Sequence, residues 1–354
     1  MIEPKTYRLR TETSVFVGHE RTVERFLIAS LGGHFPVLNR DPDGQLAAVV
    51  RVGDIHIGQL GSLAVTTSPD GGESWTRVRV VADEGSDMRN PGFGISSKGT
   101  WILAYVALDS YENGFWKPAM HDHHEVFIRR STDKGRTWSE PCIMDPHGNK
   151  LSSPFGKILH AADGTLLMSV YGQKGNWIYR SRDDGLTWGD PSHVAEGYNE
   201  TGLVFLDDRR MLAFLRSSAP MEDANLWQSA SDDAGYHWSE PHRVTSGKQH
   251  PADIIRLSSG SLLLCFSHRT PPFGVWAMRS VDEGGSWDRD HIVMLTGDSS
   301  TWDCGYPSSV QLADGRIYTA FYANDSMGTV KQGERYPVGL HAAGLRWSED
   351  VFGG

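Results

Sequence analysis

The stretch Ser181-Arg182-Asp183-Asp184-Gly185-Leu186-Thr187-Trp188 returns along the chain in related form. Four further copies keep its spacing of Ser, Asp, Gly and Trp: Ser68–Trp75, Ser131–Trp138, Ser231–Trp238 and Ser280–Trp287. In each copy the Ser and Asp side chains can accept hydrogen bonds from nearby backbone amides, Gly allows a positive φ, and Trp packs on apolar neighbours. We call each copy a Trp turn and expect it to be structural, with no part in catalysis.

The spacing of the Trp turns predicts the architecture. Their tryptophans follow one another at intervals of 63, 50, 50 and 49 residues, and a four-stranded propeller blade takes roughly 40 to 50. Short hairpin patterns, in which a polar turn that contains Gly in all but one case joins two apolar strands, precede the turns. They cover Phe35–Val50, Gly92–Val106, Phe155–Val170, Gly202–Leu215, Ala252–Phe266 and Ser308–Phe321. The sequence therefore predicts an all-β fold, a six-bladed β-propeller of four-stranded antiparallel blades forming a single domain over residues 1–354.

Closing such a ring requires one more pairing. The last blade gains a third strand near Ala342–Trp347 but has no outer strand after it. The alternating segment Tyr7–Val17 has no hairpin of its own, so we expect this N-terminal strand to close the last blade.

Composition narrows the choice of partners. The chain has 34 basic and 44 acidic residues and a formal charge of −10, which disfavours nucleic acid and anionic membranes. Three cysteines without metal-ligand spacing and a start without a leader pattern favour a cytoplasmic protein with reduced thiols. We interpret His121, His123 and His124 as a polar lid or subunit contact, and we expect no metal or other cofactor.

Candidate site residues lie where the predicted inner strands begin. Because those strands all enter the ring at one face, their first residues converge on its axis whatever their separation in sequence. The openings contain His34, Arg89, Glu200, His250 and Tyr306. The return strands, which end at the same face, contribute Arg51, Asp54, Arg216 and Arg269.

These residue types suit an acidic sugar. A guanidinium group binds a carboxylate through two parallel hydrogen bonds and stays charged at any working pH, which favours Arg216 and Arg269 as ligands. Tyr306 could be a nucleophile if Glu200 takes the proton of its phenol, whose ordinary pKa is near ~10. A neutral nucleophile is favoured where the anomeric carbon carries a carboxylate, because an attacking carboxylate would be repelled.

At these motifs the chain resembles the sialidase (neuraminidase) superfamily, whose Asp-box, or BNR, repeats read Ser-x-Asp-x-Gly-x-Thr-Trp on a six-bladed propeller. The resemblance covers most of the chain. It implies that Tyr306 is the nucleophile and Glu200 its base. It also implies that Arg216 and Arg269 are the second and third arginines of a carboxylate-binding triad, and that Asp54 is the acid/base.

One position departs from that pattern. The family's first blade begins Arg-Ile-Pro and supplies the first triad arginine, whereas this chain has His34-Phe35-Pro36. Arg40, Arg51 or Arg89 could compensate, or the substrate differs from ordinary sialic acids. If His34 contacts a substrate carboxylate, binding should strengthen as the pH falls towards about 5.5, where a histidine becomes charged.

Three functional hypotheses follow. The first is an exo-acting glycoside hydrolase of carbohydrate metabolism, an exo-alpha-sialidase or an enzyme for a related carboxylated sugar. In it Asp54, Glu200 and Tyr306 are catalytic, and the substrate is held by His34, Arg51, Arg89, Arg216, His250 and Arg269. The second is a propeller-type lyase or glycosidase acting on uronate- or rhamnose-containing glycans. The third is a propeller that binds acidic glycans without turnover.

Overall fold

The computed structural model describes residues 7–10, 22–30, 32–117, 120, 124–220, 224–324 and 339–353 of the chain. These residues form an all-β, propeller-like fold, with the 3-10 helix η3 (Glu349–Phe352) near the C-terminus. Within the described ranges, no helix has the length and apolar character needed to cross a membrane.

Three sheets consist of four strands in which sequence neighbours pair antiparallel. The first contains β3 (Gly32–Arg40), β4 (Leu46–Val52), β5 (Ser62–Ser68) and β6 (Arg79–Ala82). The second contains β17 (Tyr198–Phe205), β18 (Met211–Ser217), β19 (Leu226–Ser231) and β20 (His242–Arg243). The third contains β21 (Gln249–Arg256), β22 (Leu262–His268), β23 (Gly274–Ser280) and β24 (Val293–Thr296).

A fourth sheet has eight strands and consists of two antiparallel runs of four. One run contains β7 (Asp87–Ile95), β8 (Trp101–Leu108), β11 (Val126–Ser131) and β12 (Cys142–Ile143). The other contains β13 (Ser153–His160), β14 (Leu166–Gly172), β15 (Gly175–Ser181) and β16 (Gly189–Ala195). The runs join through a short parallel pairing of β7 with β13, in which Gly92 lies opposite Gly156.

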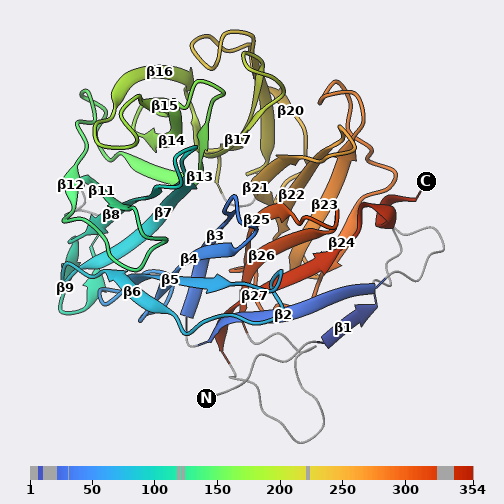
Figure 1. The fold of residues 1–354 in the computed structure, drawn as a ribbon, viewed down its shortest axis with the longest axis horizontal. Coiled ribbons are helices and arrows are strands. Elements are labelled where there is room, and N and C mark those ends of the chain that lie inside the picture. The colour runs from blue at the N-terminus through green and yellow to red at the C-terminus, as the bar shows by residue number, and fades with distance from the viewer. Residues whose placement is uncertain are drawn as a thin grey trace, which may run out of the picture.

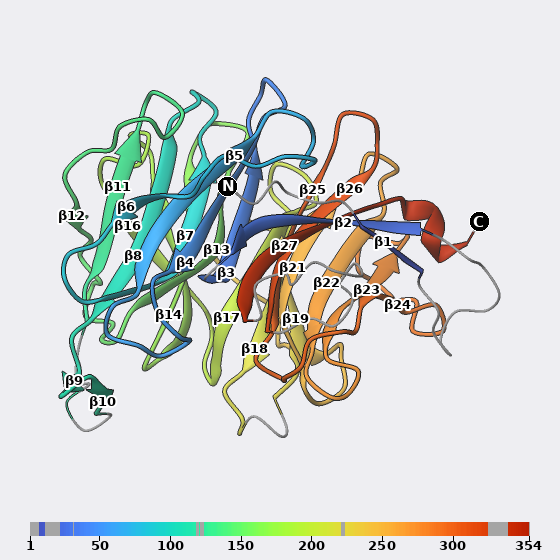
Figure 2. The ribbon, with the colours of Figure 1, turned by 90° about the horizontal axis from the view of Figure 1, so that it is seen from below.

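A small hairpin of β9 (Tyr111–Glu112) and β10 (Phe115–Trp116) follows β8. It extends beyond the sheets on the side where β8 ends (Figure 2). Of the histidine cluster noted in the sequence, His121 and His123 lie outside the described residues.

The last sheet joins the two ends of the chain. Its order is β25 (Gly305–Gln311), β26 (Ile317–Asn324), β27 (Leu340–Trp347), β2 (Thr22–Ser30) and β1 (Tyr7–Arg10). The N-terminal segment expected to close this sheet was wrongly assigned as Tyr7–Val17. The strand that pairs with β27 is β2, whose Val23, Phe26 and Ile28 are buried, while β1 pairs only with the outer edge of β2. The more apolar segment takes the inner position because it buries more surface there.

The inner strands of the four-stranded sheets, of the two runs of the eight-stranded sheet and of the last sheet form a closed ring. Each contacts the next in the order β3, β7, β13, β17, β21 and β25, and β25 contacts β3 again. Figure 1 shows β3, β13, β17, β21 and β25 around the middle of the molecule, with β12, β16 and β1 towards its edge. Residues that begin these inner strands are thereby brought together at one end of the ring.

The Trp turns have the expected structure. In the copy at Ser181, the serine Oγ accepts a hydrogen bond from the Gly185 amide at 2.8 Å and Asp183 Oδ1 accepts one from the Thr187 amide at 2.9 Å. Trp188 Nε1 donates to the Gly185 carbonyl at 3.3 Å. Each turn follows a third strand, which runs away from the end where the inner strand begins, so the turns lie at the opposite end of the molecule from the candidate site residues.

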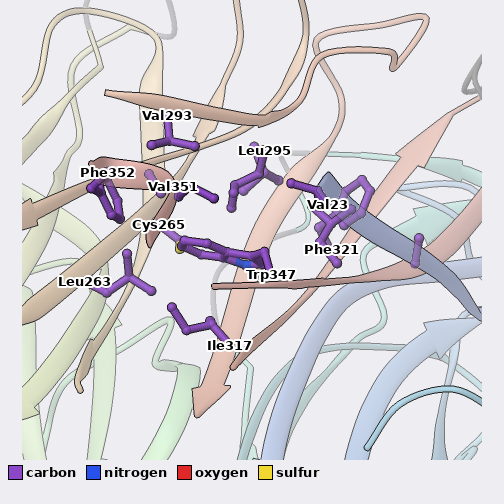
Figure 3. Packing of buried hydrophobic residues seen from close by; sticks show 14 of the residues in the cluster. Val23, Leu263, Cys265, Val293, Leu295, Ile317, Phe321, Trp347, Val351 and Phe352 are labelled. Carbon is purple, nitrogen blue, oxygen red and sulfur yellow. The ribbon is translucent and has the colours of Figure 1, made fainter. Parts of the chain in front are cut away.

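The core lies between neighbouring sheets. Between the third four-stranded sheet and the last sheet, the buried Trp347 packs with Cys265, Leu263, Ile317 and Phe321 (Figure 3). Val23 of β2 and Val351 and Phe352 of η3 belong to the same cluster, so both chain ends contribute to it. This packing fixes β26 and β27, and with them the strand β25 that carries Tyr306.

Candidate active site

Three inner strands have irregular backbone beside the candidate residues. The inner strands β3, β7 and β25 each begin with a shift of register, and the left-handed residues Phe35 (φ 52°), Asn90 (φ 52°) and Tyr306 (φ 49°) lie at these shifts. Such a backbone costs on the order of 1–3 kcal/mol for a residue other than glycine. Bulges of this kind commonly redirect side chains beside binding sites.

The backbone of Tyr306 is held from the neighbouring sheet. Its amide donates to Ser267 Oγ at 2.8 Å. Gly305 before it has φ 95°, and a Cβ there would lie 2.2 Å from the same Oγ. A glycine is therefore required for Tyr306 to approach β22 this closely.

Tyr306, Glu200 and Arg216 form a connected group. The Tyr306 hydroxyl donates to Glu200 Oε1 at 2.6 Å, although the two residues are 106 positions apart. Arg216 Nη1 donates to Glu200 Oε2 at 2.5 Å and lies 3.4 Å from the Tyr306 hydroxyl. The expected hydrogen-bond distance between Tyr306 and Glu200 is confirmed.

The surroundings of Tyr306 keep its hydroxyl protonated. Burial and the negative charge of Glu200 raise its pKa well above the ordinary value near 10, and the nearby guanidinium groups of Arg216 and Arg269 offset only part of this. A phenolate therefore does not form spontaneously near neutral pH. Any nucleophilic reaction of Tyr306 needs its proton to pass to Glu200 as the bond forms.

Arg216 and Arg269 lie beside Tyr306, and each has a hydrogen-bond donor without a partner among the described residues. The Arg269 guanidinium lies 5.4 Å from the centre of that ring, and its Nε donates to the His250 carbonyl at 3.0 Å. Arg269 Nη2 and Arg216 Nε are buried and have no hydrogen-bond partner among the described residues. Buried unpaired donors on charged groups are costly, so these two nitrogens indicate a site for an anionic ligand.

His250 is a neutral group near these two arginines. Its side chain is fully buried, and neither ring nitrogen has a hydrogen-bond partner within the described part of the chain. Burial and the positive charges of Arg216 and Arg269 lower its pKa to about 2. His250 can therefore donate or accept a hydrogen bond but contributes no charge near neutral pH.

Arg51 does not fit its expected place among the substrate ligands. Its side chain is fully buried and paired with the equally buried Asp87, with Nη2 2.6 Å from Asp87 Oδ1. Its remaining donors reach the carbonyls of Asp54, Ile55 and Gly58 in the loop after β4. The guanidinium group of Arg51 is therefore paired within the protein, where its hydrogen bonds hold this loop in place.

Of the other arginines considered as compensation for His34, only Arg89 is near the site. Its guanidinium lies 5.7 Å from the centre of the Phe35 ring, and its Nη1 is 3.4 Å from Asp87 Oδ2. Arg40 stands at the opposite end of β3 and donates to the Gln311 carbonyl.

His34 is buried in an aromatic cluster. Its ring centre is 5.4 Å from that of Phe35 and 5.0 Å from that of Tyr322. Burial, His56 and Arg51 lower its pKa to about 2, although Asp303 acts in the opposite direction. A charge on His34 near pH 5.5, on which the expected pH dependence of binding rests, is therefore disfavoured, because the low-dielectric surroundings oppose the imidazolium form.

An open cavity of about 760 Å³ lies beside this cluster, which is within the usual range for a small-ligand site. Asp54 lines it, with its carboxylate accepting hydrogen bonds from the amides of Ile55 and Leu60. Trp302 also lines it, and the centre of the Trp302 ring is 5.7 Å from the guanidinium carbon of Arg269. The cavity therefore lies next to the pair Arg216 and Arg269. A second cavity, of about 30 Å³, contacts Glu200 and Tyr306 from within the ring and has room for little more than a water molecule.

Sequence reasoning missed Asp303 as a member of the site. This residue lines the open cavity, and its Oδ1 lies 2.7 Å from His56 Nδ1. Asp54 and His56 both stand in the loop after β4, which ends at Val52. The signal for Asp303 was its position three residues before Tyr306, just ahead of an inner strand.

Comparison with known proteins agrees with this architecture. Residues 64–319 match the model of the family described as BNR repeat-like domain. A curated sialidase from Bacteroides fragilis (strain YCH46) is 22% identical over 313 residues, which cover 76% of this chain and 56% of that protein. The chain thus spans little more than half the length of this relative.

Solved structures show the same fold. A protein of unknown function from Dyadobacter fermentans DSM 18053 has a TM-score of 0.74 at 20% identity and covers 97% of this chain and 99% of its own. The NanB sialidase from Streptococcus pneumoniae has a TM-score of 0.68 at 12% identity, covering 97% of this chain and 71% of its own.

Proposed function

Because the chain belongs to the BNR repeat-like domain family, within the sialidase superfamily of propellers, we propose that it is an exo-acting glycoside hydrolase that removes a terminal carboxylated sugar such as a sialic acid. We also propose that its sheets are six blades of one domain. The closed ring of first strands and the division of the eight-stranded sheet into two runs of four support that count.

The hydroxyl of Tyr306, 2.6 Å from Glu200 and flanked by two arginines with unpaired donors, is the observation that carries the proposal. In the proposed first step the Tyr306 oxygen attacks the anomeric carbon, and its proton passes to Glu200 Oε1. The bond from that carbon to the leaving oxygen breaks, and Asp54, in its protonated form, protonates this oxygen. Water then attacks the anomeric carbon while Asp54 takes one of its protons, the bond from that carbon to the Tyr306 oxygen breaks, and Tyr306 recovers its proton from Glu200.

Arg216 and Arg269 bind the sugar carboxylate in this proposal. Arg216 Nε and Arg269 Nη2 gain the partners that they lack among the described residues. His250 and His34, both neutral, are left to hydrogen-bond hydroxyl or amide groups of the sugar. The positive charge at the carboxylate comes from the arginines and is therefore independent of pH over the working range.

A substrate screen tests the proposal. Purified protein is mixed with aryl α-glycosides of sialic acids, with those of related keto acids and with those of hexuronic acids, and the products are identified by NMR. We expect release of the free acidic sugar. Tyr306→Phe should lower kcat by at least about a thousandfold while a non-hydrolysable analogue binds nearly as before, because only the nucleophilic oxygen is lost.

Tyr179→Phe is the matched control. It also removes a buried hydroxyl, which donates to the Pro146 carbonyl away from the site, and should leave kcat unchanged. An unsaturated sugar among the products, which forms by elimination without addition of water, would show that the protein is a lyase and not a hydrolase. Specific binding of acidic glycans without any turnover would replace it by a binding protein.

A further inference from the structure

Three potential metal ligands converge on the wall of the open cavity. They are His34 at the start of β3, His56 in the loop after β4, and Asp303 just before β25. One ligand atom from each lies within 4.8 Å of the others. In the part of the chain that the structure describes, no other group of three His, Cys, Asp or Glu residues meets this arrangement.

Two imidazoles and one carboxylate with an open side are a ligand set typical of divalent transition metals, including zinc in sites that keep a position free for water or substrate. Zinc bonds of about 2.0–2.2 Å place tetrahedral ligand atoms roughly 3.4 Å apart. Ligand atoms as far apart as 4.8 Å would therefore have to approach by up to about 1.4 Å, whereas His56 Nδ1 and Asp303 Oδ1, at 2.7 Å, would move slightly apart. His56, whose side chain is 28% exposed, stands in a loop and has room to make this adjustment.

The surroundings already orient two of the ligands. Tyr322 donates its hydroxyl to the carboxylate oxygen Oδ1 of Asp303 at 2.5 Å, and Asn324 Nδ2 holds the backbone by donating to the main-chain carbonyl of Asp303 at 2.8 Å. Such supporting hydrogen bonds are characteristic of metal-binding carboxylates. Packing against Phe35 and Tyr322 fixes the ring of His34.

His34 supplies a second, independent observation. Its side chain is only 2% exposed, and its Nδ1 is buried with no hydrogen-bond partner among the described residues. A buried imidazole nitrogen that is left unpaired is costly unless something else binds it.

We propose that His34, His56 and Asp303 bind one divalent transition metal ion, with Zn²⁺ as the probe, and that its open coordination position faces the cavity. There it would accept an oxygen of the bound ligand. This last use depends on the proposed glycosidase function, whereas metal binding itself does not.

Calorimetry tests the site directly. Untagged full-length protein is freed of metal with a chelator, dialysed and titrated with ZnCl₂, and Co²⁺ is added separately to record the visible spectrum of its bound form. We expect one ion per chain and a rise in melting temperature with Zn²⁺. His56→Ala should weaken binding by at least about a hundredfold and abolish both the spectrum and the rise, because loss even of groups that support a ligand typically costs 10–100-fold in affinity.

His291→Ala is the matched control. It removes another histidine paired with an aspartate, Asp288, at 2.9 Å but without a third ligand, and should keep the wild-type affinity. Asp303→Asn should repeat the loss seen with His56→Ala. Absence of Zn²⁺ binding by the wild type would overturn the proposal, and so would unchanged binding by His56→Ala, which would place the ion elsewhere.

The outcomes separate this site from the proposed function. Zn²⁺ binding that depends on His56, in a protein that cleaves no acidic glycoside, would retain the metal site and reject the hydrolase. Glycoside hydrolysis by a protein that binds no Zn²⁺ would retain the hydrolase and reject the metal site.

Discussion

Replacing Asp87 with asparagine tests whether Arg51 is structural or binds substrate. Both side chains are fully buried, and Asp87 Oδ1 accepts from Arg51 Nε at 3.0 Å and from Nη2 at 2.6 Å. Asp87 Oδ2 also accepts from the hydroxyl of Tyr111 at 2.6 Å. The variant Asp87→Asn therefore leaves a buried guanidinium group without its counter-charge.

The expected cost is large. Removing one member of a buried ion pair typically costs about 3–5 kcal/mol, because the other charge stays desolvated. That is a substantial part of the roughly 5–15 kcal/mol by which a folded protein is stable. Arg51→Met should cost a similar amount, since it strands Asp87 and removes the donors to the carbonyls of Asp54, Ile55 and Gly58.

Denaturant unfolding followed by tryptophan fluorescence measures these costs. The double variant Arg51→Met/Asp87→Asn should lose less free energy of unfolding than the two single losses added together, because it contains no stranded charge. If Arg51→Met instead raised KM and left the free energy of unfolding unchanged, Arg51 would be a substrate ligand and the structural assignment would be refuted.

Three further predictions concern other parts of the molecule. Glu200→Gln should lower kcat by about 10²–10⁴-fold in the same glycosidase assay, because an amide cannot take the Tyr306 proton; an unchanged kcat would exclude Glu200 as the base. Deleting residues 1–30 should lower the free energy of unfolding far more than deleting residues 1–18, which leaves β2 intact, and equal losses would contradict the role given to β2. Hydrogen bonds from Ser286 and Ser280 lower the pKa of Asp282 to about 2, below its unfolded value near 3.8. The stability this adds is therefore present above about pH 4 and lost as the pH falls towards 2, so Asp282→Asn should flatten the acid end of the stability profile.

The repeat made the propeller-like fold accessible from sequence. Within each Trp turn, the bonds from backbone amides to the repeated Ser and Asp side chains join residues at most four positions apart, as between Ser181 and Gly185. The pattern is therefore visible in the sequence without knowledge of the rest of the fold. The closing strand was harder, because nothing local distinguishes a strand that pairs with β27 from one that pairs with its neighbour. Burial of Val23, Phe26 and Ile28 decided the matter, and burial is a property of the whole fold.

The pairing of Glu200 with Tyr306 could be predicted because the ring brings the starts of inner strands together. The same reasoning failed for Arg51. Its position on a return strand placed it correctly near one face, but its direction and its pairing with Asp87 depend on the neighbouring sheet. The position of Arg51 along its strand predicts at which end of the ring it lies. The buried carboxylate of Asp87 beside it determines that its guanidinium group is paired within the protein.

The same distinction applies to His34. At the sequence level it is a histidine in place of an arginine, which suggests a charge that varies with pH. In the structure it is packed against Phe35 and Tyr322, and burial lowers its pKa to about 2, which disfavours that charge. What this position offers the cavity is an imidazole nitrogen beside His56 and Asp303, two residues contributed by loops whose paths no repeat pattern specifies. This position thus offers a neutral imidazole nitrogen where an arginine would place a positive charge, and the Zn²⁺ titrations of the wild type and of His56→Ala decide whether His34, His56 and Asp303 bind a metal ion.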